Sequence, residues 1–322
     1  MLSEVTSAAK PRSHRRRRYS HNIPIEPRSA RALGHLARFS MLSVPQLAYA
    51  MGQSETTAKY ALLELKHHDL VCYCGMTQPG APADRPSNPY RLHSLTKRGI
   101  ERAEIEGVLD EETVAVLGQM PVPRNWSPTT RVDPELYHRQ GVVDIMTAYW
   151  RSLMRWNDRY EILRMTQDFI RRQKAKKFRS ALDDQNRRGQ PVRVDAFFMH
   201  RNRATKQALD LCVEFDRGTC PLSGDDGKRT TIEAKLSKLE HYVCDTNRAL
   251  PIGDVSALLY VTMTTRRISQ IREALRWELT PNVARSIRFA VLRHLKDDFL
   301  GRVWQDVDGN FVPLAGPLRD AA

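Results

Sequence analysis

The chain has 322 residues, of which 41% are hydrophobic, and it carries a formal net charge of +14. This length predicts about two domains with hydrophobic cores and argues against global disorder. The longest apolar runs are much shorter than the roughly 20 residues of a membrane-spanning helix, and no signal peptide is expected. An odd number of cysteines, five, argues against a disulfide framework and favours a reducing, cytoplasmic compartment.

The basic excess indicates a polyanionic partner, and nucleic acid is the commonest one. A membrane surface is the other polyanion, but no amphipathic anchor accompanies the charge. Near the N-terminus, a segment rich in arginine and poor in apolar residues predicts a disordered arm that contacts phosphates or a minor groove. A tail without a defined site is the alternative. The arginine cluster of this arm is Arg15, Arg16, Arg17 and Arg18.

Composition and hydrophobic pattern divide the chain into an arm, two folded domains, a linker and a tail. Prolines at 121, 123, 128 and 134 exclude a long helix between the two folded domains. The segments are 1–26, the basic arm; 27–107, a DNA-binding domain; 108–135, the linker; 136–300, an α/β domain; and 301–322, the C-terminal tail.

The first folded segment predicts three helices, then a β-hairpin and a further helix, which is the order of a winged helix-turn-helix. Ser43 and Ser54 are typical N-cap residues for the second and third helices, and Gly52 is expected to end the second. The third helix has apolar residues at three-to-four spacing. Alternating stretches at 71–75 and 90–95 flank a proline-rich loop and predict the wing.

In a helix-turn-helix, the N-terminal part of the third helix faces base edges and phosphates in the major groove, and a wing contacts the flanking backbone. Double-stranded DNA is therefore the expected partner, with the base sequence left open. The alternative is a winged helix that makes protein contacts only. The residues expected to contact DNA are Thr56, Thr57, Lys59 and Tyr60 in the helix, and Arg85 and Arg91 in the wing.

Beyond residue 135, predicted helices and strands alternate, which indicates an α/β domain. Two of its strands are predicted at 192–199 and 208–215. Side chains two apart in a strand share a face, so the second strand separates into an apolar face and a polar face. The apolar face carries Leu211, Val213 and Phe215, and the polar face carries Asp210, Cys212, Glu214 and Asp216.

Acidic residues on a mostly apolar strand require a cation or a metal ion beside them. Asp195 is expected to end the neighbouring strand, close to Glu214 and Asp216. Three carboxylates at adjacent strand ends suit one or two Mg²⁺ or Mn²⁺ ions, which prefer oxygen ligands and activate water for phosphate chemistry. The alternative is an ion pair with Arg217 or Arg193. No glycine-rich phosphate loop is present in the sequence, so no nucleotide cofactor is expected.

The order helix, strand, strand, strand, helix, strand, with an acid on the second strand and Glu-x-acid on the third, resembles the PD-(D/E)xK nuclease superfamily. A more specific likeness, over about residues 30–295, is to the replication-relaxation family of plasmid proteins. This resemblance implies an α+β winged helix-turn-helix followed by an α/β restriction-endonuclease-like domain with a mixed central sheet. The likeness rests on the winged helix, the helix of His138, Val194–Phe197, Glu214–Thr219, Lys235–Leu236 and Tyr242.

By this resemblance, Asp195 and Glu214 are the two acids of the nuclease pattern, and Asp216 stands where the pattern has a lysine. An aspartate does not supply the positive charge that orients the attacking water. Either Lys235 or Lys238 on the next predicted helix replaces the lysine, or the domain keeps the fold without cleavage. The first alternative implies a catalytic set of Asp195, Glu214, Asp216 and Lys235, with the metal on the three acids.

Three functions are therefore open. The family likeness implies a protein of plasmid replication, DNA relaxation or mobilisation, related to MobC-type relaxases, which binds origin DNA and recruits a relaxase or a replication protein. The carboxylates favour a Mg²⁺- or Mn²⁺-dependent nickase or endonuclease. A transcriptional regulator, in which the second domain only dimerises, is the third. The oligomeric state is left open.

Overall fold

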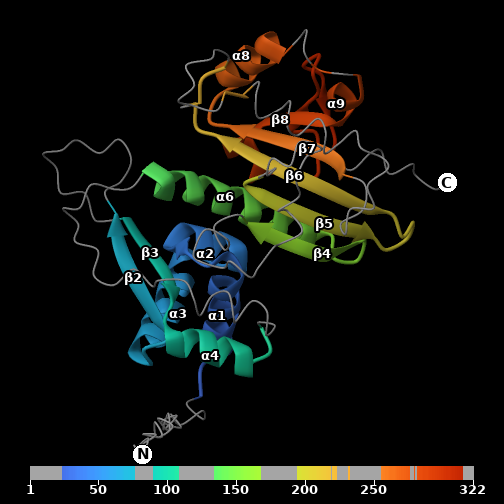
Figure 1. Cartoon of the computed structure of the whole chain (residues 1–322). Coiled ribbons are helices and arrows are strands. Elements are labelled where there is room, and N and C mark those ends of the chain that lie inside the picture. The colour runs from blue at the N-terminus through green and yellow to red at the C-terminus, as the bar shows by residue number, and fades with distance from the viewer. Residues whose placement is uncertain are drawn as a thin grey trace, which may run out of the picture.

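A computed structural model of the chain describes residues 24–76, 90–108, 134–167, 194–218, 220–222, 231–232, 255–275, 279 and 281–314 (Figure 1). The predictions for the basic arm with Arg15 to Arg18, for Arg85 in the wing and for Lys235 fall outside these residues. Within the described part of the chain, no helix is both long enough and apolar enough to span a membrane.

The N-terminal part has the topology of a winged helix. Its sheet has the order β1-β3-β2, with both pairings antiparallel. Three helices precede the hairpin of β2 and β3, and one follows it, as the sequence predicted. The elements are α1 (Pro27–Phe39), β1 (Leu42–Ser43), α2 (Val44–Met51), α3 (Glu55–His67), β2 (Val71–Met76), β3 (Tyr90–Leu95) and α4 (Lys97–Ile105).

The predicted helix ends are confirmed. Ser43 begins α2 with a capping box, in which its side chain accepts from the Gln46 backbone and the Gln46 side chain accepts from the Ser43 N–H. Gly52 ends α2 in the left-handed conformation, with φ 65°, and its N–H reaches the carbonyls of the last turn. Ser54 caps α3 by accepting a hydrogen bond from the Thr57 N–H.

The second part is built on a mixed sheet with the order β10-β9-β8-β7-β6-β5-β4. The pairings β4–β5–β6 are antiparallel, β6–β7–β8 parallel, and β8–β9–β10 antiparallel. The elements are α6 (Pro134–Arg155), β4 (Tyr160–Gln167), β5 (Ala196–Asn202), β6 (Ala208–Asp216), β7 (Val255–Thr262), α8 (Thr265–Leu275), α9 (Pro281–Ser286), β8 (Ile287–Val291), α10 (Leu292–Leu295), β9 (Trp304–Gln305) and β10 (Phe311–Val312).

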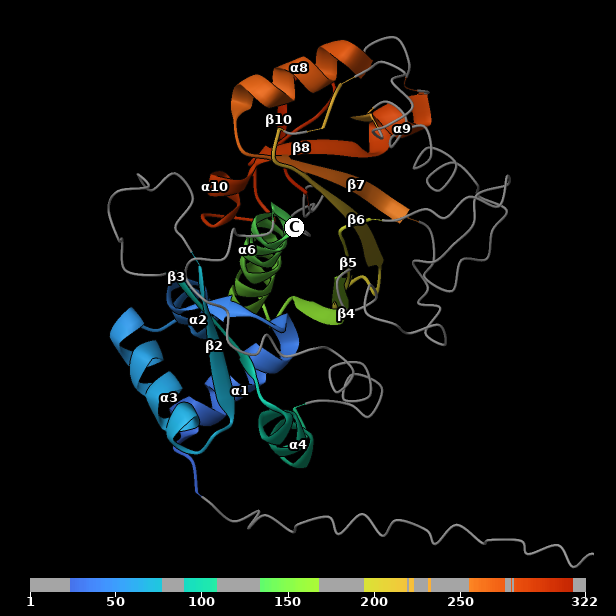
Figure 2. The ribbon, with the colours of Figure 1, turned by 60° about the vertical axis from the view of Figure 1, so that its left-hand side comes forward.

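The sheet buries both faces, with α6 on one side and α8 on the other (Figures 1 and 2). Alternation along β6 follows the prediction. Leu211, Val213 and Phe215 belong to the core that includes α6, whereas Cys212 belongs to the core that includes Ile268 of α8. The acidic face of β6 is therefore the face toward α8.

Helix α6 also packs against the winged helix, so one hydrophobic core runs from α1 and α2 through α6 to the sheet (Figure 1). The Arg38 guanidinium lies 3.8 Å from the centre of the Trp150 ring, and Phe39 meets the same ring edge-on. The Gln46 side chain donates to the Asp144 carboxylate across the contact, at 3.1 Å. The winged helix is thus held on the C-terminal part by apolar and polar contacts.

Two predictions about the second part require correction. The strand expected at 192–199 runs instead from Ala196 to Asn202, because its pairing with β4 continues to the Tyr160–Asn202 position. The segment expected to be a tail contributes β9 and β10 to the sheet. Trp304 of β9 is fully buried, and its indole N–H donates to the Phe299 carbonyl at 2.7 Å. These strands have two residues each, too few for an alternating pattern to reveal them.

Candidate functional site

The outer face of α3 carries three of the residues that were predicted to contact DNA. Thr56, Lys59 and Tyr60 are exposed, and Tyr60 lies near the Arg28 guanidinium. Thr57 is half-buried, and its backbone N–H and its hydroxyl both form hydrogen bonds with the side chain of the capping Ser54. Thr57 therefore takes part in the N-terminal cap of α3, whereas Thr56, Lys59 and Tyr60 present their side chains to solvent.

Arg91 of the wing lies across a groove from α3, and two residues that were not predicted from the sequence accompany it. The Lys66 ammonium lies 4.5 Å from the centre of the Tyr73 ring, and the Arg91 guanidinium lies 5.0 Å from it. Lys66 follows Lys59 by two helical turns, so their spacing already placed them on one face of α3. Tyr73 faces His93 in the hairpin register.

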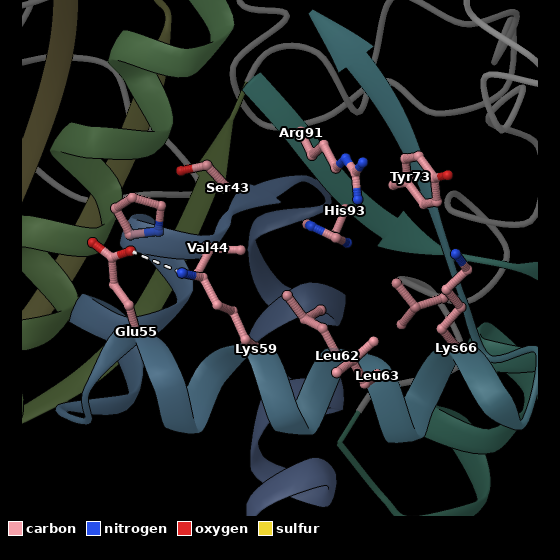
Figure 3. Close-up of a pocket in the computed structure, with 12 residues that line it drawn as sticks. Ser43, Val44, Glu55, Lys59, Leu62, Leu63, Lys66, Tyr73, Arg91 and His93 are labelled. Carbon is pink, nitrogen blue, oxygen red and sulfur yellow. Dashed lines mark ion pairs between the residues drawn. The ribbon is translucent and has the colours of Figure 1, made fainter. Parts of the chain in front are cut away.

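The groove itself is formed by α3 on one side and by β2 and β3 on the other, with the start of α2 at one end (Figure 3). Its volume is about 600 Å³. Lys59 of α3 pairs with Glu55 at 3.9 Å, and both side chains are largely exposed. An exposed pair of this kind is weak, so Lys59 remains available to an anionic partner.

The acidic strand β6 is the second candidate site. Glu214 is 2% exposed and Asp216 is 5% exposed. Burial raises the pKa of the Cys212 thiol well above its usual range, and the neighbouring Glu214 and Asp210 raise it further. Burial likewise raises the pKa of Tyr260 on β7, again helped by Glu214 and Asp216. These carboxylates therefore gather on one buried face, as the sequence predicted.

Asp195 lies immediately before β5 and not at the end of that strand, which corrects the prediction. Because β5 is antiparallel to β6, its start nevertheless meets the end of β6. The Asp195 N–H donates to the Val213 carbonyl at 2.9 Å, and its Oδ2 accepts from the Phe215 N–H at 2.8 Å. Its Oδ1 lies 2.8 Å from Nε2 of His138, a residue of α6 for which no chemical role was predicted from the sequence.

Asp216 forms an ion pair with Arg267 of α8, with its Oδ2 2.6 Å from the arginine Nε. Arg267 also donates to the Cys220 carbonyl. Both charged side chains are nearly buried, so they compensate each other. An ion pair was the alternative interpretation of this acid, and its partner comes from α8. The Arg217 guanidinium, one of the two expected partners, lies over the Tyr137 ring, and Arg193 falls outside the described residues.

This arrangement does not fit a metal ion held by Asp195, Glu214 and Asp216 together. Both Asp195 oxygens already have hydrogen-bond partners, and Asp216 faces a guanidinium. In the part of the chain that the structure describes, no group of three His, Cys, Asp or Glu residues is suited to hold a metal. The proposed Mg²⁺ or Mn²⁺ remains a prediction, as does the role of Lys235.

No family model and no curated protein matches the chain. Among solved structures, it is similar to Lactococcus lactis ZitR (C30AH42A mutant), with 15% identity over 41% of this chain and 79% of that one, at a TM-score of 0.22. It is also similar to a protein with a GntR superfamily winged-helix-turn-helix domain from Halomicrobium mukohataei, with 20% identity over 36% and 85% and a TM-score of 0.23. At these scores neither likeness carries weight, and the winged-helix topology rests on the chain's own elements and pairing.

Proposed function

We propose that this protein binds double-stranded DNA through the outer face of α3 and the wing. The observation that carries the proposal is a winged helix whose exposed α3 face and wing share three cations, Lys59, Lys66 and Arg91, in a chain of net charge +14. In a helix-turn-helix, this helix enters the major groove, while cations beside it contact phosphates.

The exposed residues divide into two kinds of contact. Thr56 and Tyr60 are exposed on α3, and in this proposal they contact base edges or sugars. Lys59, Lys66 and Arg91 supply phosphate contacts, which position the duplex without reading its sequence. The N-terminal arginines would add further, sequence-independent attraction.

Fluorescence anisotropy with duplex DNA at several salt concentrations tests the proposal. A Lys59→Gln/Lys66→Gln/Arg91→Gln variant is expected to bind every duplex more weakly and to reduce the salt slope by about one for each phosphate that is no longer neutralised. Lys97→Gln, which removes an exposed lysine of α4, is the matched control. It is expected to leave the affinity for duplex DNA and the salt slope unchanged. Absence of duplex binding by the wild type at low salt overturns the proposal.

The finer proposal is a role in plasmid replication, DNA relaxation or mobilisation, with a relaxase or a replication protein as partner. Its support is the resemblance in the sequence, above all the stretch Glu214–Thr219. To test this role, the protein is immobilised, fragmented DNA from the cells that encode it is passed over it, and the bound fragments are sequenced. Enrichment of a plasmid origin or transfer origin supports it, whereas enrichment of the protein's own promoter alone favours a transcriptional regulator.

A metal-dependent nickase or endonuclease is the second candidate. The observation in its favour is that α6, the antiparallel β4–β5–β6 and the parallel β7 bring Asp195 next to the end of β6, which carries Glu214. The resemblance in the sequence, which pairs an acid on one strand with Glu-x-acid on the next, also supports this candidate. The His138–Asp195 contact would hold that carboxylate in place and supply a group able to accept or donate a proton.

Supercoiled plasmid, incubated with protein and Mg²⁺ or Mn²⁺, tests the nuclease. Cleavage by the wild type that disappears in Asp195→Ala/Glu214→Ala supports it, and Lys235→Ala then tests whether that lysine takes part. If the wild type and the double variant leave the plasmid equally supercoiled, the nuclease proposal fails. Duplex binding, measured on the same preparations, distinguishes that failure from loss of DNA binding.

A further inference from the structure

The groove between α3 and the wing has an apolar floor as well as a cationic rim. Val44, Pro45, Leu62 and Val71 line it together with the larger side chains of Leu63 and Tyr73. Leu63 is 61% exposed and Tyr73 is 41% exposed. Exposed large apolar groups that gather in one hollow mark a contact site. DNA phosphates are charged and hydrated, so they do not account for the apolar floor.

The size of the groove suits a small molecule. A volume of about 600 Å³ lies within the range of about 300–1,000 Å³ that is typical of small-molecule pockets. Such pockets combine a mostly apolar lining with a few polar groups that fix the orientation of the ligand. In Figure 3, Lys66, Tyr73 and Arg91 stand together at the end of the groove away from Glu55.

The charge of the groove indicates the sign of its ligand. Glu55 is the one acid among the described residues that line it, and Lys59 pairs with that acid. Lys66 and Arg91 lie on the Tyr73 ring. Burial, together with the nearby Arg91 and Lys66, lowers the pKa of His93 in the same lining to about 4. The local potential is therefore positive, and His93 is neutral at pH 7.

We propose that this groove binds a small aromatic anion, with its rings between Leu63 and Tyr73 and its acidic group at Lys66 and Arg91. Charge complementarity and the apolar floor together select an organic carboxylate or sulfonate over an inorganic ion. Because the same cations serve the DNA interface proposed above, the anion and duplex DNA exclude each other. That exclusion rests on the proposed function, whereas the binding of the anion does not.

Two fluorescent probes that differ in one group test the site directly. Anilinonaphthalene sulfonate carries the same rings as N-phenyl-1-naphthylamine but adds the anionic sulfonate. Saturable binding of the sulfonate to the wild type is expected. A Lys66→Gln/Arg91→Gln variant is expected to bind the sulfonate about tenfold more weakly, since the sulfonate loses two exposed charge pairs. The same variant is expected to bind the neutral probe unchanged.

Leu63→Ser removes part of the apolar floor of the groove and is expected to weaken the binding of both probes. Phe311→Ser, which removes an exposed ring on β10, is the matched control and is expected to change neither. All these side chains are exposed, so the variants are expected to fold, and circular dichroism checks it. No saturable sulfonate binding to the wild type, or equal sulfonate binding to the wild type and to Lys66→Gln/Arg91→Gln, overturns the proposal.

A competition experiment with duplex DNA then distinguishes a failure of the anion site from a failure of the proposed function. If DNA displaces the bound sulfonate, the shared surface is supported. If the sulfonate binds in the groove but the protein binds no duplex, the proposed function fails and the anion site stands. If both bind at once without competition, the proposed exclusion is overturned.

Discussion

Asp216 ends the acidic strand with a carboxylate that meets Arg267 at 2.6 Å, and both side chains are almost excluded from solvent. Removal of one member of a buried ion pair leaves an uncompensated charge, which typically costs about 3–5 kcal/mol. We therefore expect Arg267→Met to lower the free energy of unfolding, measured by urea titration, by about that amount. Arg267→Met/Asp216→Asn is expected to recover much of the loss, because neither charge remains.

The same pair tests the metal interpretation of Asp216. If Asp216→Asn alone is as stable as the wild type, the ion pair is not a structural contact and the carboxylate is available for another ligand. A large loss of stability in that single variant supports the pairing with α8 that the structure gives.

His200 on β5 is buried between Tyr149 and Tyr160, and burial lowers its pKa to about 4 from the ordinary 6.5. The unfolded chain takes up a proton near pH 6.5, whereas the folded chain resists it until about pH 4. The contribution of His200 to stability is therefore complete above pH 6.5 and falls as the pH falls toward 4, by up to about 3 kcal/mol.

His200→Gln keeps a group able to bond with the Tyr149 hydroxyl, which lies 3.1 Å from His200 Nδ1, but it does not titrate. We expect the free energy of unfolding of this variant to depend less steeply on pH between 6.5 and 4. Urea titrations at several pH values measure the slope. Equal slopes in the two proteins contradict the assignment, and His35 and His93, whose pKa values are also about 4, then carry the dependence.

At this scale, the sequence predicted which face of β6 is acidic, because alternation is a local property. It did not predict the partners of the acids. His138 is 57 positions from Asp195, and Arg267 is 51 positions from Asp216. Both partners come from helices on opposite sides of the sheet, and a single chain carries no local signal for such contacts.

Among the elements, those with a strong local pattern were predicted, namely the capped helices α2 and α3, the hairpin of β2 and β3, and the buried strands. The start of β5 and the short strands β9 and β10 were not. Strand ends depend on where pairing with a neighbour stops, and pairing is a tertiary property. The order of the sheet likewise emerges only from the pairing of the strands.

Helix α6 approaches β6 closely at one glycine. A Cβ atom on Gly141 would collide with the Phe215 ring, the same ring that the His138 imidazole packs against. Although alanine is the better helix former, we expect Gly141→Ala to destabilise the protein by about 1–3 kcal/mol, because α6 or the ring must shift. Gly34→Ala on α1 meets only Val108 at ordinary contact distance and is the matched control, expected to be neutral or stabilising. A Gly141→Ala protein as stable as Gly34→Ala contradicts the close approach.

At the scale of the whole molecule, α6 packs against two parts of the chain, the central sheet and the winged helix. One side of it covers the sheet, and the other receives α1 and α2 of the winged helix, so that a single core includes both (Figure 2). The side chain of Gln46 links the two, because it completes the cap of α2 and also bonds to Asp144 of α6. DNA bound at α3 would therefore lie in a fixed orientation to the acidic strand.

A tryptophan at this contact makes the shared core testable. Trp150 packs against Arg38, Phe39 and His35 of α1. In the wild type, we expect the slowest-exchanging amides of α1 and of β6 to report the same free energy of opening, because one core holds both. Trp150→Ala is expected to lower the value for α1 by about 2 kcal/mol more than the value for β6. Trp156→Ala, which removes a ring that is 42% exposed and lies just beyond α6, is expected to lower neither value. If α1 already opens far more easily than β6 in the wild type, the winged helix is an independent unit, and its orientation to the acidic strand is not fixed.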